Sequence, residues 1–271
     1  MKGMDKRVGF IGAGNMASAL ISGMINAGFK PENIIASSPG KDHLDLVSKK
    51  FGVQTSNTNE LVFKECEVII YAGKPNVLKT VLEEYKNFSS EEMLLISVAA
   101  GFKIFDIEGI LSAEQRIIRA MPNTPASIRS GVTAISLNEN ASSDDKQNAE
   151  DLFSCVGEVV HIQEKEMDLY TALIGSGPAY VFYLIESLLD SSSELEMDEE
   201  TKKNMITSMI TGSSKLALMS ENSPEKLREN VTSPGGVTQR AIEEFEKNGV
   251  KETIIKAIEA ATNKSKELGD N

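Results

Sequence analysis

The sequence predicts a doubly wound α/β sheet at the N-terminus, followed by an all-α domain. Three observations support this fold class. A glycine-rich turn joins the first apolar run to a helical pattern. Short apolar runs of strand length then alternate with helical patterns to about residue 164. Beyond that point only helical patterns remain. We therefore expect two domains, 1–164 and 165–271.

The N-terminal elements follow from the alternation of short apolar runs with longer amphipathic ones. The expected strands are 7–11, 33–37, 67–71, 93–98, 115–119, 132–136 and 158–162, with one more short strand before Asn59. The expected helices are 15–27, 42–51, 75–85 and 144–154.

The C-terminal part carries apolar residues at helical spacing throughout. Ser223 before Pro224 is a helix-start signal, because serine caps a helix and proline suits its first turn. The expected helices are 166–173, 178–189, 199–220, 224–230, 238–247 and 251–268. The segment 199–220 is rich in Met, Ile and Leu. Helices this apolar in so small a domain indicate that a face is buried against another subunit, so we expect an oligomer.

The bulk composition excludes several function classes. The formal charge of −12 argues against unspecific nucleic-acid binding, which needs a basic face. No apolar run approaches the roughly 20 residues that span a bilayer, so we expect no membrane segment. Cys66 and Cys155 lack the spacing of a metal site or a disulfide framework. Two reduced thiols and no bound metal are expected in a cytoplasmic protein.

The glycine-rich turn predicts a dinucleotide site. The segment Gly12-Ala13-Gly14-Asn15-Met16-Ala17 follows a strand and opens a helix, the context that makes this pattern specific. Gly12 permits the tight turn, Gly14 lets a pyrophosphate approach the backbone, and Ala17 keeps the helix close to the sheet. The pyrophosphate would face the positive end of the helix dipole. The first domain is therefore expected to be of the Rossmann type.

The end of the second strand favours NADPH over NADH. An NAD site usually has a carboxylate here, but this strand ends in Ser37 and Ser38 with Lys41 following. These groups can donate hydrogen bonds to a 2′-phosphate. Asp42 keeps NADH open as the alternative, because its carboxylate could reach back to the ribose. Asn59 is expected at the adenosine end of the cofactor.

Further cofactor contacts are expected where later strands end, since these ends border the ligand crevice in an open α/β sheet. Lys74 is a candidate for the cofactor phosphates or ribose. Small residues after the fifth strand should leave room for the nicotinamide ribose, and two prolines fix a loop beside the ring. The candidates are Ala72, Lys74, Pro75, Ala99, Ala100, Gly101 and Asn123.

The sequence gives no support for hydrolysis or for alcohol oxidation. The sequence has no HExxH and no GxSxG, and both histidines, His43 and His161, are interpreted as structural or surface residues. A known family with the same two-domain layout oxidises β-hydroxy acids with a lysine in the helix after a Gly-x-Gly turn. Val181 stands at that position here. Hydride transfer to a protonated imine needs no such base.

Six segments together resemble Δ1-pyrroline-5-carboxylate reductase over essentially the whole chain. They are 12–17, 36–39, 73–75, 121–125, 175–180 and 230–238, and the last, with Val231-Thr232-Ser233-Pro234-Gly235-Gly236-Val237-Thr238, is the most diagnostic. The resemblance implies reduction of the cyclic imine to L-proline with NAD(P)H, the final step of proline biosynthesis. It also implies a helical dimerisation domain with interleaved helices and, in many members, a ring of five dimers.

The resemblance also implies a substrate site. The substrate carboxylate would bind backbone N–H groups of Gly235, Gly236 and Val237 at the start of a helix, with Ser233 adding a donor. Thr238 would lie next to the ring nitrogen as a hydrogen-bond partner or proton relay. Glu221 and Asn230 would flank the ring. The other side of the site would be formed by Ser176, Gly177 and Tyr180.

One departure and two alternatives accompany this prediction. Ala172-Leu173-Ile174 replaces a Gly-Leu-Ser common in the family, and we expect it to change packing more than chemistry. A reductase of a related cyclic imine, such as a six-membered ring, would use the same carboxylate site. A dinucleotide-binding protein without enzymatic activity, such as a vitamin-B6-handling partner, would need the glycine-rich turn but not segment 231–238.

Overall fold

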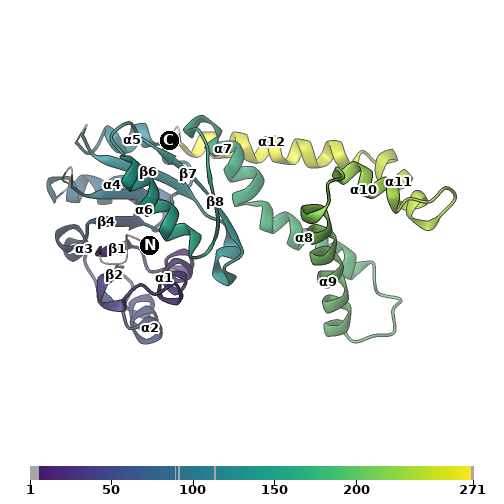
Figure 1. Cartoon of the computed structure of the whole chain (residues 1–271), viewed down its shortest axis with the longest axis horizontal. Helices are drawn as coiled ribbons and strands as arrows, with labels where there is room; N and C mark the ends of the chain where they lie inside the picture. Colours follow the sequence, from purple (N-terminus) through teal and green to yellow (C-terminus); the bar gives the residue numbers. More distant parts are fainter. Residues whose placement is uncertain (1–5, 89, 91, 113, 270–271) are drawn as a thin grey trace. The chain divides into compact units, whose positions relative to one another are not determined.

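An eight-stranded sheet forms the N-terminal half of the protein (Figure 1). The computed structural model describes residues 6–88, 90, 92–112 and 114–269. The strand order is β3-β2-β1-β4-β5-β6-β7-β8, in which β1 to β6 are parallel, β7 runs antiparallel to β6, and β8 pairs parallel with β7. The first six strands have the Rossmann order, which confirms the predicted fold class. The strands are β1 (Val8–Ile11), β2 (Ile34–Ser37), β3 (Gln54–Ser56), β4 (Val68–Tyr71), β5 (Leu94–Ser97), β6 (Arg116–Met121), β7 (Gly131–Leu137) and β8 (Gly157–His161).

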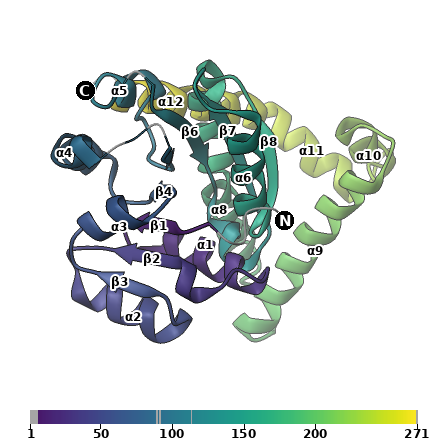
Figure 2. The ribbon, with the colours of Figure 1, turned by 60° about the vertical axis from the view of Figure 1, so that its left-hand side comes forward.

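Helices cover both faces of this sheet, as a doubly wound fold requires. The helices are α1 (Asn15–Asn26), α2 (Lys41–Phe51), α3 (Glu60–Glu65), α4 (Pro75–Tyr85), α5 (Ile104–Glu108) and α6 (Ser143–Ser154). Figure 2 shows α2 beside β2 and β3, with which it is in contact. Of these helices, α3 and α5 were not expected from the sequence, because each is too short to show a full helical period.

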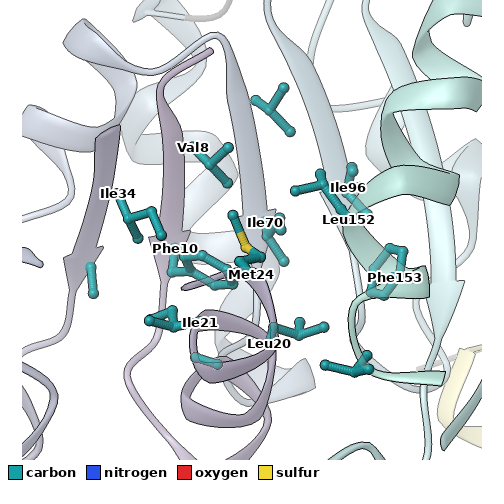
Figure 3. Close-up of a cluster of buried hydrophobic side chains, with 14 of the residues drawn as sticks. Val8, Phe10, Leu20, Ile21, Met24, Ile34, Ile70, Ile96, Leu152 and Phe153 are labelled. Atoms are coloured by element: carbon teal, nitrogen blue, oxygen red, sulfur yellow. The ribbon is translucent and has the colours of Figure 1, made fainter. Parts of the chain in front are cut away.

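Two hydrophobic clusters fill the space between sheet and helices. Alternate residues of a strand point to opposite faces, so Phe10 joins the cluster under α1 and α6 while Ile11 joins the cluster under α3 and α4. Figure 3 shows the first cluster, in which Leu20 and Met24 of α1 meet the strands and Phe153 of α6. Each strand from β1 to β5 except β3 is buried at every position. This pattern is typical of a parallel sheet with both faces covered.

The second half of the chain is helical. Its elements are the short turn Glu164–Glu166, α7 (Met167–Tyr170), a π-helical turn (Thr171–Gly175), α8 (Gly177–Asp190), α9 (Glu199–Met219), α10 (Pro224–Asn230), α11 (Val237–Lys247) and α12 (Val250–Gly269). The predicted helices 178–189, 199–220, 224–230, 238–247 and 251–268 match these within one residue at each end. The pair α8 and α9 is in contact.

The compact units of the structure differ from the predicted division at residue 164. Residues 1–176 and 261–271 cluster with the sheet, and 177–260 form a second unit. Residues 164–176 stay with the sheet because Met167 is fully buried and the Tyr170 hydroxyl donates to the Val132 carbonyl at 2.9 Å. The end of α12 returns to it through Ser265, whose hydroxyl donates to Asp168 at 2.8 Å.

A buried arginine ties these returning segments to β6. Arg119 is 1% exposed, with Nη1 3.3 Å from Glu164 and Nη2 3.8 Å from Asp168. Glu164 also accepts the Ile104 N–H at 2.7 Å. Asp168 accepts the Ser265 hydroxyl, so one cation connects β6, the start of α7 and the last turns of α12. A buried charge is stable only with such partners.

The helical run Glu164–Asp190 is longer and more apolar than the sequence analysis expected. It is 27 residues long with a mean hydropathy of 1.4 in its most apolar window, enough by length and composition for a membrane span, although none was expected. Only 6% of that window is buried in the structure. The run includes a π-helical turn and Pro178, and its exposed apolar face is equally what a subunit contact requires.

Candidate functional site

The glycine-rich turn between β1 and α1 has the geometry of a phosphate-binding loop. Gly12 has φ +105°, and a Cβ there would lie 2.7 Å from the carbonyl of Ala72, so only glycine fits. Gly14 precedes α1, and a Cβ there would meet no atom within 4 Å. The first intrahelical bond runs from Ser18 N to Gly14 O, which leaves earlier amides without helical acceptors. Ala17 is fully buried against the sheet.

The tip of β2 is arranged differently from the sequence prediction. Ser37 was expected to donate to a 2′-phosphate, but it is fully buried. Its hydroxyl donates to Asn59 Oδ1 at 2.8 Å, with the Phe10 carbonyl 3.2 Å away. Ser37 therefore positions the Asn59 loop. Ser38 is half-buried and Lys41 is exposed at the first position of α2, so these two residues present donors beside a helix N-terminus.

The segment after β4 lines the other side of the turn. Ala72 N donates to Ile11 O at 2.8 Å, which fixes Ala72 directly under Gly12. The Tyr71 hydroxyl donates to the Lys74 carbonyl at 2.8 Å, and burial raises the pKa of this phenol to about 12. Lys74 is exposed and Pro75 opens α4. Both residues follow the carboxyl end of β4, where the sequence analysis placed them.

The small residues after β5 do not all leave open space. Ala99 is 2% exposed, and Ala100 is partly exposed beside it. Gly101 was expected to make room for the nicotinamide ribose, but a Cβ there would lie 2.8 Å from Leu268 Cβ. The last turn of α12 occupies that side, which no local pattern around Gly101 predicts. The glycine is needed for this close approach of α12.

The loop after β6 is fixed by the Asn123 side chain. Asn123 is 7% exposed, accepts the Val132 N–H at 2.9 Å and donates to the Ile174 carbonyl at 3.3 Å. It thus joins the start of β7 to the π-helical turn. Ala172, which begins the segment that replaces the Gly-Leu-Ser, lies in that turn and is buried. A hollow of about 380 Å³ borders the first turn of α1 and Thr124 of this loop.

The candidate substrate segment lies in the second compact unit, between α10 and α11. Gly235 has φ +73°, and Gly236 precedes α11. The first intrahelical bond runs from Arg240 N to Gly236 O, so the amides of Val237 and Thr238 have no acceptor within the helix. These exposed amides are suited to an anion.

Two amides of this segment are already hydrogen-bonded, contrary to the prediction of free N–H groups. Gly236 N donates to Ser233 O at 3.0 Å, which closes the turn. Gly235 N donates to the side-chain oxygen of Gln239 at 2.5 Å. Gln239 was missed in the sequence, although it stands one helical turn after Gly235, and that spacing is the signal that could have found it.

The other predicted substrate residues lie on several elements. Asn230 ends α10, Glu221 follows α9, and Tyr180 is on the first turn of α8, where it is 39% exposed. Ser176 ends the first compact unit and Gly177 begins the second. The predicted site residues therefore belong to two separate compact units.

The thiols do not provide a nucleophile. Burial raises the pKa of the Cys66 thiol to about 12 and also raises that of Cys155, so both stay protonated near neutral pH. Within the described part of the chain, no three His, Cys, Asp or Glu side chains are grouped as metal ligands. The site therefore rests on backbone amides and hydroxyls.

Family models match both halves of the chain. Residues 7–101 match the family described as NADP oxidoreductase coenzyme F420-dependent. Residues 164–268 match the family described as pyrroline-5-carboxylate reductase dimerisation. The first match covers the glycine-rich turn and the ends of β2, β4 and β5. The second covers the exposed helices and the segment between α10 and α11.

Full-length relatives agree with these matches. The pyrroline-5-carboxylate reductase of Methanosarcina acetivorans is 37% identical, covering 98% of both chains. The structure of Plasmodium falciparum pyrroline carboxylate reductase with NADP bound is 36% identical with a TM-score of 0.91, covering 98% of this chain and 99% of that one. The enzyme structure from Coxiella burnetii is 38% identical with a TM-score of 0.87, covering 97% and 98%. The chain belongs to the pyrroline-5-carboxylate reductase family.

Proposed function

We propose that this protein reduces 1-pyrroline-5-carboxylate to L-proline by hydride transfer from NADPH. Membership of the reductase family over nearly the whole chain is the observation that carries the proposal. The tight Gly12 turn under Ala72 and the amides at the start of α11 support it, because the first suits a pyrophosphate and the second suits a carboxylate.

The residues around the turn fit NADPH. The amides of Asn15 and Met16 would bind the pyrophosphate, and Lys74 would reach the phosphates or ribose. The 2′-phosphate would bind Ser38, Lys41 and the N-terminus of α2, since the described tip of β2 carries hydroxyls and a lysine. When bound, this cofactor supplies a hydride equivalent from its nicotinamide ring. We propose that the protein prefers NADPH to NADH.

A substitution at the tip of β2 tests the cofactor preference. Ser38→Glu places a carboxylate beside the proposed 2′-phosphate, which it would repel. We expect the ratio of kcat/KM for NADPH to that for NADH to fall by at least tenfold. Ser130→Glu, in the loop before β7, serves as the control and should leave the ratio unchanged. An unchanged ratio in Ser38→Glu would remove Ser38 from the site.

The chemistry needs no strong base. The substrate imine is electrophilic once its nitrogen is protonated, so the hydride adds to the imine carbon and the C=N π electrons become the nitrogen lone pair. Charge balances because one hydride and one proton are consumed for each proline formed. Thr238 would hold the nitrogen by a hydrogen bond. The amides of Gly235, Val237 and Thr238, with Ser233, would hold the carboxylate. Glu221, Asn230, Ser176, Gly177 and Tyr180 would enclose the ring.

Steady-state kinetics test the reaction. The purified protein should oxidise NADPH only when 1-pyrroline-5-carboxylate is added, and should form proline. Thr238→Ala should lower kcat by about 10²-fold, the lower range for a positioned proton-transfer group, with the Kd for NADPH unchanged. Thr253→Ala, an exposed helical threonine whose hydroxyl bonds Gly249 O, is the matched control. Binding of NADPH without turnover would refute the proposal, and faster reduction of a six-membered imine would favour the related reductase.

We extend the proposal to assembly and location. The family match describes a dimerisation domain, which supports a homo-oligomer built on the exposed helices. We further propose that five dimers form a ring. Sedimentation equilibrium tests this assembly, which should have the mass of ten chains. We propose that residues 1–164 bind the dinucleotide and that residues 165–271 provide dimerisation and substrate binding. The free thiols Cys66 and Cys155 favour the cytoplasm.

A further inference from the structure

A side chain occupies part of the proposed carboxylate site. Gln239 Oε1 accepts the Gly235 N–H at 2.5 Å, and Gln239 Nε2 donates to Glu243 Oε1 at 2.9 Å. Gln239 and Glu243 are four residues apart and share one side of α11, and Gly235 lies four residues before Gln239 in the turn that precedes the helix. The result is a chain of hydrogen bonds that ends at the amide where an anion would bind.

The hydrogen bond to Glu243 sets the orientation of the Gln239 amide. Glu243 can only accept hydrogen bonds when ionised, so it holds the NH₂ group and leaves the oxygen facing Gly235. Glu243 is itself held by Arg240, whose Nη1 lies 3.5 Å from Oε2. The NH₂ group of Gln239 is therefore directed away from the Gly235 N–H, so it cannot donate to a carboxylate that is bound there.

The two bonded amides of the turn differ in what holds them. Gly236 N bonds the backbone carbonyl of Ser233, which belongs to the turn itself. Gly235 N bonds a side chain that can rotate away without moving the backbone. Gly235 also has open space where a Cβ would stand, with no atom within 4 Å. A ligand oxygen at the place of Oε1 therefore requires only a rotation of the Gln239 side chain.

We infer that Gln239 is a specificity-determining residue that competes internally for the substrate carboxylate at Gly235 N–H; this inference rests on the proposed function. A carboxylate accepts a stronger, charge-assisted hydrogen bond than a neutral amide does. It therefore displaces Oε1. A ring without a carboxylate has no group that competes for this N–H, so its binding does not depend on Gln239.

Gln239→Met tests the inference, because methionine keeps the length of the side chain and removes its acceptor oxygen. Loss of one net hydrogen bond from the free state should lower the KM for 1-pyrroline-5-carboxylate by about twofold to tenfold. The kcat and the Kd for NADPH should not change, nor should the KM for the neutral imine 1-pyrroline. A raised KM for the carboxylate substrate would show that Gln239 assists binding instead and would overturn the inference.

Gln239→Glu tests it in the opposite direction. A tethered carboxylate is a stronger competitor, so the KM for 1-pyrroline-5-carboxylate should rise by at least tenfold at pH 7.5 and recover towards pH 5 as the new side chain begins to protonate. An unchanged KM, or a rise that does not depend on pH, would contradict the inference.

A matched control and the parent enzyme separate the possible failures. Gln147→Met changes a glutamine with the same arrangement on α6, where Nε2 donates to Asp151 at 3.0 Å, and should leave every constant unchanged. If the parent protein does not reduce 1-pyrroline-5-carboxylate, the proposed function fails. If the parent turns over and Gln239→Met leaves its KM unchanged, only the role of Gln239 fails. Unfolding curves of each variant verify that the protein is folded.

Discussion

The helices α1 and α8 carry similar apolar residues but meet different surroundings. α1 has 12 residues, of which six are buried against the sheet, whereas none of the 14 residues of α8 is buried. Phe182 and Tyr183 of α8 are 60% and 72% exposed. A helix apolar on this scale needs a partner surface, because most helical stability comes from tertiary packing. The sheet unit therefore packs its apolar helix α1 within one chain, whereas the unit 177–260 requires a second subunit to cover α8.

The largest effect we expect is loss of the buried cation in the sheet unit. Arg119→Met removes the partner of Glu164 and Asp168, whose carboxylates then remain against the sheet without compensation. Breaking a buried pair in this way costs about 3–5 kcal/mol of unfolding free energy. Urea unfolding monitored by far-UV circular dichroism measures it.

Arg7→Met is the matched control for that prediction. Arg7 pairs with Glu65, and the two side chains are 42% and 36% exposed. An exposed pair of this kind contributes at most about 1 kcal/mol. Equal losses in the two variants would contradict the special role of the buried Arg119.

A charge on α8 should separate the subunits. Phe182→Asp places a carboxylate in the expected apolar contact, and a change at such an interface residue costs about 2–4 kcal/mol of association free energy. Sedimentation velocity would then show a smaller species. Phe105→Asp, at a phenylalanine that is 78% exposed on α5 of the sheet unit, should leave the mass unchanged. The opposite pattern would place the subunit contact on the sheet unit.

Two glycines of the cofactor turn should respond differently to a methyl group. Gly12→Ala forces a strained φ and a clash with Ala72, which costs about 1–3 kcal/mol of folding stability in addition to NADPH affinity. Gly14→Ala meets no atom of the chain, so stability should stay the same while NADPH binding weakens at least tenfold. Thermal unfolding and a fluorescence titration with NADPH separate the effects. Unchanged affinity in Gly14→Ala would remove the pyrophosphate from this turn.

Alkaline pH should weaken the sheet unit by the smallest amount. The pKa values of Tyr71 and Tyr170 are raised to about 12 by burial, above the ordinary value of 10. Below pH 10 both phenols are protonated in the folded and the unfolded protein, and their contribution to folding stability is fully present. As pH rises towards 12, this contribution is lost, because the phenols ionise in the unfolded protein before they ionise in the folded one. Urea unfolding at pH 8, 10 and 11 should show a falling stability, and Tyr71→Phe should reduce the slope. An equal slope in that variant would reject the contribution of Tyr71.

The sequence predicted local features well and distant contacts poorly. The turn at Gly12 and the helix start at Pro224 are both indicated by neighbouring residues in the sequence, so both were predicted. Gly101 meets Leu268, more than 160 residues away, and no local pattern contains that contact. The burial of Ser37 depends on Asn59 in the same way. Gln239 was missed because a polar residue in the first turn of a helix is ordinary until its partner Gly235 is known.

Hydrogen–deuterium exchange in the parent protein and in Phe182→Asp tests the comparison between the two units most directly. We expect the slow exchange of α1 and of β1 to β6 to be the same in both proteins. Amides of α8, α9 and α11 should be slow in the assembled parent and should exchange faster, by at least tenfold, in the dissociated variant. Equal protection of these helices in a demonstrably monomeric protein would contradict the claim that residues 177–260 are completed by a second subunit.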